Sequence, residues 1–159
     1  MSLAVTAYNV VLALHIVAVV VAFGWTFALP LFFVVAARHG PRSLPLLHRI
    51  EYTATRWILN PALVVVLGAG IFLASDGHHW SEFFVQWGLG AIVVIGAVAG
   101  SVMIPASKRA EQAALAAAAG GGEPSPSPAY TAAIRRLNAV GSLLWLLVIA
   151  TIAIMAIKP

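Results

Sequence analysis

The stretch that decides the fold is AVTAYNVVLALHIVAVVVAFGWTFALPLFFVVAA, residues 4–37, which contains no formally charged side chain. Three more apolar stretches follow it, at residues 57–75, 83–106 and 137–157. Each is long enough to cross a hydrocarbon core of about 30 Å, because a helix rises about 1.5 Å per residue. In lipid such stretches form helices or a closed barrel, and none shows the alternating pattern of barrel strands. The sequence therefore predicts an all-α polytopic membrane protein, a four-transmembrane-helix bundle.

We expect a single transmembrane domain over residues 1–159, with helices at about 7–37, 56–75, 83–106 and 137–157. Pro30 in the oversized first helix predicts a kink or a tilt. Residues 38–56 predict a short amphipathic helix on the membrane surface. A short helical extension follows residue 106, and residues 119–129 predict a flexible cytoplasmic linker.

The composition excludes several classes of protein. The chain is 62% apolar and 9% charged, whereas soluble domains carry roughly a quarter charged residues. Its nine Lys and Arg residues flank the helices and form no stripe, so we expect no nucleic-acid binding. The absence of cysteine excludes disulfides, thiolate metal sites and cysteine nucleophiles. No nucleophile triad, phosphate loop or zinc-hydrolase motif is present, so the sequence predicts no hydrolase.

The basic residues also predict the orientation. The loops after the first and before the last apolar stretch hold eight of them: Arg38, Arg42, Arg49, Arg56, Lys108, Arg109, Arg135 and Arg136. The loop SDGHHWSE, residues 75–82, holds none. Basic loops stay in the cytoplasm, so we expect a multi-pass protein of the inner (plasma) membrane with both termini outside. The N-terminus lacks the basic region and cleavage site of a signal peptide.

His15 is the clearly titratable side chain that lies well within an apolar stretch. Intramembrane ionisable residues are costly and commonly functional. Three interpretations are open: a neutral histidine hydrogen-bonded to a neighbouring helix, a haem or metal ligand, and a proton relay.

His78 and His79 lie in the outward loop with Asp76 and Glu82. Imidazoles and carboxylates suit Zn²⁺ or Cu²⁺, so the loop is a candidate metal site. The alternative is an interfacial loop anchored by Trp80 and Trp87.

Polar residues at the cytoplasmic helix ends form a third candidate group, which includes Arg56, Asn60 and Asn138. Such residues either bind lipid phosphate and set the topology or hold the carboxylates of a porphyrin. Glu51 and Arg56 are five residues apart, so we expect a pair across helices instead of one along a helix.

Gly96 and Gly100 form a GxxxG step in the third helix. Small residues at this spacing let two helices approach closely in lipid. The step predicts either packing within the bundle or a homodimer interface.

A family resemblance extends over nearly the whole chain. Its most specific parts are His15, the Leu29-Pro30 step, the Pro61 region with its following glycines, the segment DGHHWSEFFVQWGLG, and a terminal Arg-x-x-Asn…Lys-Pro. The chain resembles small bacterial four-helix membrane proteins of unknown function, which in turn resemble copper-resistance-D-like proteins and HemJ-type protoporphyrinogen oxidases.

The resemblance to the oxidases implies that His15 ligates haem b. The oxidases also need a lysine in the third helix, where this chain has Gly88 to Ala91. An arginine expected after the Leu-Pro step is Leu31 here, and Ala139 and Gly141 replace an expected Glu and Pro. These departures argue against porphyrinogen oxidation, so whether the chain is an enzyme is left open.

Three hypotheses follow: a haem- or porphyrin-binding membrane protein that uses His15, a structural or accessory membrane protein, and a copper- or zinc-handling protein that uses the outward histidines.

Overall fold

A computed structural model describes residues 6–38, 43–119 and 128–158, and every regular element in them is helical. In chain order the elements are α1 (Ala7–Arg38), α2 (Leu44–Ala54), the π-turn η2 (Thr55–Leu59), α3 (Asn60–Asp76), α4 (Phe83–Val98), the π-turn η3 (Ala99–Met103), α5 (Ile104–Ala119) and α6 (Pro128–Ile157). The elements join into four long helices: α1, α2–η2–α3, α4–η3–α5 and α6. Each contains a segment long and apolar enough to cross a membrane.

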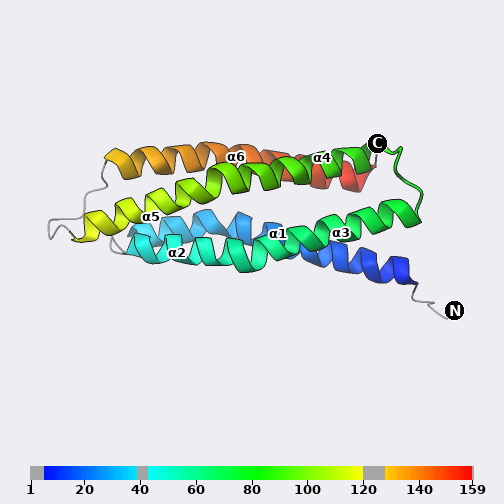
Figure 1. The fold of residues 1–159 in the computed structure, drawn as a ribbon, viewed down its shortest axis with the longest axis horizontal. Coiled ribbons are helices and arrows are strands. Elements are labelled where there is room, and N and C mark those ends of the chain that lie inside the picture. Colours follow the sequence, from blue (N-terminus) through cyan, green and yellow to red (C-terminus); the bar gives the residue numbers. More distant parts are fainter. Residues whose placement is uncertain (1–5, 39–42, 120–127, 159) are drawn as a thin grey trace.

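The four helices run side by side as an elongated bundle (Figure 1). We call one end the terminal end: it holds the start of α1, the end of α6 and the turn at residues 77–82. We call the other the basic end, because its helices carry Arg38, Arg49, Lys108, Arg109, Arg135 and Arg136. α1 packs mainly on α3, α5 packs on α2 and α6, and α4 packs on α6.

The predicted four-helix architecture is confirmed, and two details differ. The amphipathic segment expected on the membrane surface is α2, which continues without a break through η2 into α3. The face of α2 that holds Leu47, His48, Glu51 and Ala54 is buried and meets the other helices instead. The last helix begins at Pro128, well before the expected residue 137, and proline suits a first helical turn. The predicted linker lies largely in residues 120–127, outside the described part.

Both π-turns precede a proline by a few residues. Pro61 follows η2 and Pro105 follows η3. Proline has no N–H and its ring crowds the carbonyl four residues earlier, so a widened turn relieves the clash. In each case the residue before the proline bonds five residues back, from Asn60 N–H to the Thr55 carbonyl and from Ile104 N–H to the Ala99 carbonyl.

The basic end contains the best-packed part of the described bundle. Ala106, Ala110, Ala114, Tyr130 and Leu137 form a buried cluster there between α5 and α6. About 20 helical residues cross the hydrocarbon core. Counted from the turn at 77–82, that length ends near Arg56 in the second helix and Met103 in the third. The cluster and α2 therefore extend past the core on the basic side.

Glycine positions show where helices approach closely. A Cβ on Gly88 of α4 would collide with the side-chain end of Met155 of α6. A Cβ on Gly96 or Gly100 would meet nothing within 4 Å, and both glycines are exposed. The expectation that the GxxxG step packs within the bundle is therefore wrong. In α4 the glycine contact with another helix is at Gly88, eight residues before Gly96.

Candidate functional site

His15 lies in the terminal half of the bundle, where α1 packs on α3. Gly70 of α3 stands opposite its ring, and a Cβ at Gly70 would lie 3.4 Å from His15 Cε1. The main chain of Val66, one turn earlier in α3, is also close to the imidazole. Gly70 thus packs directly against the imidazole ring between the two helices.

The Nδ1 atom of His15 is buried and has no hydrogen-bond partner within the described residues. An imidazole nitrogen always offers a donor or an acceptor. Leaving such a group buried and unpaired costs about 1–3 kcal/mol. Buried unpaired groups are uncommon in folded proteins and call for a specific reason.

The other residues expected in a porphyrin site lie in the opposite half. Asn60 is ten residues before Gly70 in the same helix, or about 15 Å along its axis, and Arg56 is farther still. The Arg56 guanidinium lies over the Trp57 ring, 5.8 Å from its centroid. Asn138 is exposed on α6 near the basic end. The structure does not bring these three residues together with His15.

His78 and His79 occupy the turn between α3 and α4. His78 has a positive φ of 56°, and the ring of His79 packs on Phe84 with centroids 6.0 Å apart. No three His, Asp or Glu side chains in the described ranges gather closely enough to hold a metal ion. Trp87, expected as an interfacial anchor, donates from its ring N–H to the Thr151 hydroxyl at 3.1 Å and so links α4 to α6.

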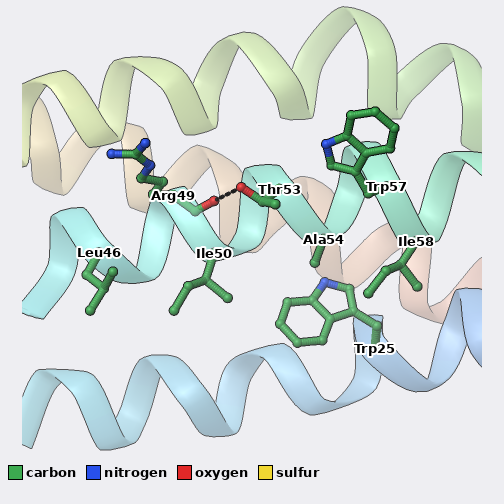
Figure 2. A pocket seen from close by; sticks show the side chains of 8 residues that line it. All are labelled: Trp25, Leu46, Arg49, Ile50, Thr53, Ala54, Trp57 and Ile58. Carbon is green, nitrogen blue, oxygen red and sulfur yellow. Dashed lines mark hydrogen bonds between the residues drawn. The ribbon is translucent and has the colours of Figure 1, made fainter.

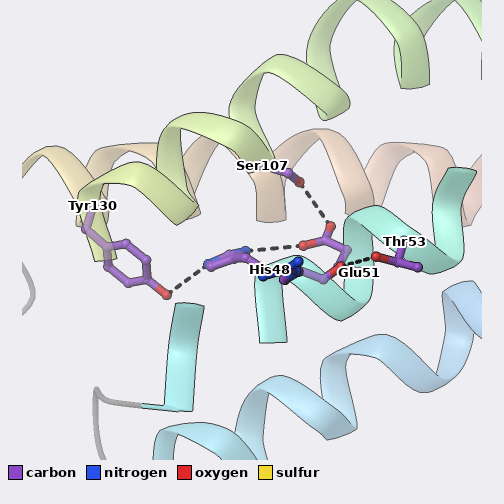
Figure 3. A network of polar contacts seen from close by, with 6 residues as sticks. His48, Glu51, Thr53, Ser107 and Tyr130 are labelled. Atoms are coloured by element: carbon purple, nitrogen blue, oxygen red, sulfur yellow. Dashed lines mark hydrogen bonds and ion pairs between the residues drawn. The ribbon is translucent and has the colours of Figure 1, made fainter. Parts of the chain in front are cut away.

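A second polar site lies at the basic end and was not predicted. His48 Nδ1 lies 3.3 Å from Glu51 Oε2, and His48 Nε2 lies 3.3 Å from the Tyr130 hydroxyl. The Ser107 hydroxyl donates to Glu51 Oε1 at 3.1 Å. These four side chains, which we call the basic-end network, come from α2, α5 and α6 (Figure 3).

The basic-end network is closed to solvent. His48 is only 1% exposed, and Phe33 of α1 covers its ring with centroids 5.2 Å apart. One hydrogen assignment satisfies every bond: Tyr130 donates to Nε2, and Nδ1–H donates to the Glu51 carboxylate. Glu51 has one partner across helices, Ser107 of α5, in line with the expectation, and a second partner, His48, along its own helix.

The sequence did carry a signal for this network. His48 and Glu51 are three residues apart and alternate with Leu47 and Ala54, so in a helix all four share one face. If the segment were a helix on the membrane surface, as expected, this face would point at the lipid headgroups. Its continuity with α3 directs it at α5 and α6 instead.

A shallow groove also lies on the outer side of α2 (Figure 2). Its volume is about 450 Å³, and the residues that line it are Trp25, Leu46, Arg49, Ile50, Thr53, Ala54, Trp57 and Ile58. Most of them are apolar, and Arg49 supplies the one formal charge of the lining.

Comparison with known proteins gives a family and no closer relative. No curated protein and no solved structure matches the chain. The resemblance to HemJ-type oxidases therefore stays a prediction. The model of one family, described as a predicted integral membrane protein family, DUF2269, matches residues 9–159. With a match over nearly its full length and four membrane-spanning helices, the chain belongs to the DUF2269 family of integral membrane proteins.

Proposed function

We propose that this multi-pass membrane protein binds haem b, or a related metalloporphyrin, through the imidazole of His15. The observation that supports the proposal is the buried Nδ1 of His15, which has no partner among the described residues. A ligand that engages the ring would offset the cost of leaving it unpaired. Haem iron is commonly held by histidine, and a helix bundle is a usual site for it.

The residues around His15 define what the chain itself contributes. Gly70 leaves room beside the ring, and the Val66 main chain lies close enough to orient it. Bound haem would supply electron transfer or ligand binding inside the membrane. Arg56, Asn60 and Asn138 lie too far toward the basic end to share the same immediate surroundings, so the proposal assigns the iron to His15 alone.

The competing function is that of a structural or accessory protein in which His15 only packs against α3 and hydrogen-bonds to it, with the Val66 main chain as the neighbour of the imidazole. A copper or zinc function through His78 and His79 is the other competitor. The missing third-helix lysine argues against porphyrinogen oxidation, so the proposal is restricted to binding.

Absorption spectroscopy of the purified protein separates these functions. Expression with ample haem should give a Soret band, and His15→Ala should abolish or shift it. The matched controls are His78→Ala and His79→Ala, which should leave the band intact. A wild-type protein with no Soret band would contradict the proposal. Metal analysis of the same samples would support the copper or zinc function if only the two loop variants lost metal.

We also propose an orientation of the protein in the membrane and a contact between two copies of the chain. The basic end lies in the cytoplasm and both termini lie outside, supported by the basic side chains at one end. A second copy packs on the face of α4 and η3 that holds Gly96 and Gly100, supported by their exposure and by the exposed Ala97 and Ser101 beside them.

A further inference from the structure

We infer that the groove on α2 is a binding site for one anionic phospholipid of the leaflet at the basic end. The proposal is independent of haem at His15. It assigns the lipid phosphate to Arg49 and one acyl chain to the apolar floor between Trp25 and Trp57.

The groove has an apolar floor where a lipid chain would lie. Figure 2 shows Ile50, Ala54 and Ile58 along the side of α2 that faces α1, with the Trp25 ring beneath them. Ile50 is 46% exposed and Ile58 is 43% exposed, whereas Ala54 between them is buried, so the floor is open at Ile50 and Ile58. Trp57, on the π-turn η2, is 70% exposed at the other rim.

Arg49 supplies the charge that selects the occupant. Its guanidinium is exposed and has no carboxylate partner within the described residues. Figure 2 shows its side chain on the side of α2 away from the floor, at the end of the groove nearer the basic end. An arginine fork binds phosphate oxygens closely. Arg49 therefore lines one edge of the groove and the apolar floor lies along the other, an arrangement that matches the two parts of a phospholipid.

The depth of the groove distinguishes it from ordinary lipid contact. The hydrocarbon core ends near Arg56, and Arg49 lies seven residues, or about 10 Å, closer to the cytoplasmic tip. Leu46 and Leu31 nevertheless are 63% and 65% exposed at this level. The opposite flank, on α5, is charged at the same level through Lys108 and Arg109. The flank formed by α1 and α2 therefore has an apolar surface that extends beyond the hydrocarbon core. A lipid displaced outward from the bilayer, or a tilt of the bundle, would cover this surface.

Quenching of tryptophan fluorescence by brominated lipid tests the site directly, because Trp25 and Trp57 line it. The full-length protein is placed in phosphatidylcholine vesicles with a small fraction of brominated phosphatidylglycerol or of brominated phosphatidylcholine. We expect stronger quenching by the anionic lipid. Arg49→Gln should weaken the apparent affinity for it about five-fold, the effect of one basic residue near a membrane surface.

The matched control is Arg136→Gln, which removes the same charge from α6 at the same end. It should keep the preference for the anionic lipid. Arg49→Lys should keep part of it, because the charge stays and the planar fork is lost. Trp25→Phe combined with Trp57→Phe should remove the extra quenching and so place it in the groove.

Three outcomes would overturn the inference. Equal losses in Arg49→Gln and Arg136→Gln would mean that the basic end attracts anionic lipid without a site. An unchanged preference in Arg49→Gln would exclude the arginine. Equal, weak quenching by both brominated lipids would mean that a second copy or another protein covers the groove. Circular dichroism of each variant verifies that it is folded before the comparison.

Discussion

His48 Nε2 and the Tyr130 hydroxyl lie 3.3 Å apart although the residues are 82 positions apart in the chain. The contact joins α2 to α6, two helices that do not follow one another in the chain. It also brings a histidine with two bonded nitrogens into the packed basic end.

Removing the Tyr130 hydroxyl should destabilise the bundle. Tyr130→Phe keeps the ring and leaves His48 Nε2 buried without its partner, so we expect a loss of about 1–3 kcal/mol in the free energy of unfolding. Thermal or denaturant unfolding in detergent measures it. Tyr52→Phe is the matched control, since Tyr52 is packed under Lys108 through its ring, which phenylalanine retains. Equal stability of the two variants would mean that the Tyr130 bond contributes nothing.

Gly88→Leu should destabilise the α4–α6 contact, because the leucine side chain would displace the end of the Met155 side chain, which lies against Gly88. Overpacking of this kind costs about 1–3 kcal/mol. The double variant Gly88→Leu with Met155→Ala should recover part of the loss, since the alanine vacates the space. Detergent melting temperatures of the two variants test this. No recovery would mean that α4 and α6 do not meet through this pair.

Gly96→Leu and Gly100→Leu should leave the monomer as stable as the wild type, because a Cβ at either position meets nothing within 4 Å. The same variants should weaken self-association, since leucine prevents two backbones from approaching. Energy transfer between labelled copies in vesicles measures association. If the wild type shows no transfer at any protein-to-lipid ratio, the second copy is not the partner of this face.

Reporter fusions test the topology. A fusion after Gly77, in the turn at the terminal end, should report the outside. A fusion after Gly121, which lies outside the described residues, should report the cytoplasm. Activity on the same side for both fusions is incompatible with an odd number of membrane crossings between them.

The architecture was predictable because long apolar runs leave a chain in lipid few choices. The interior contacts were not. Periodicity cannot say which face of an all-apolar helix meets its neighbour. A packing contact of the third helix was therefore expected at Gly96, whereas its contact with α6 is made at Gly88. The network was missed for a related reason: Ser107 and Tyr130 carry no pattern that links them to His48, and only the continuity of α2 with α3 brings them together. His15 was identified because a lone titratable group in an apolar run stands out in any arrangement.

The π-turns η2 and η3 have a consequence for the rotational phase of the bundle. Each adds one residue to a helical turn, which rotates everything beyond it by about 100° relative to an unbroken α-helix. The two turns lie at similar distances along the chain from the loop at 77–82, one in each of the helices that the loop joins. Deleting one residue from η2 would restore the regular ladder and swing His48 and Glu51 away from Ser107 and Tyr130, while His15 and Gly70 stayed in contact. The rotation of the basic-end half relative to the terminal half thus depends on the π-turns that precede Pro61 and Pro105. A change in either π-turn would alter the helix contacts of the basic end and leave those of the terminal end in place.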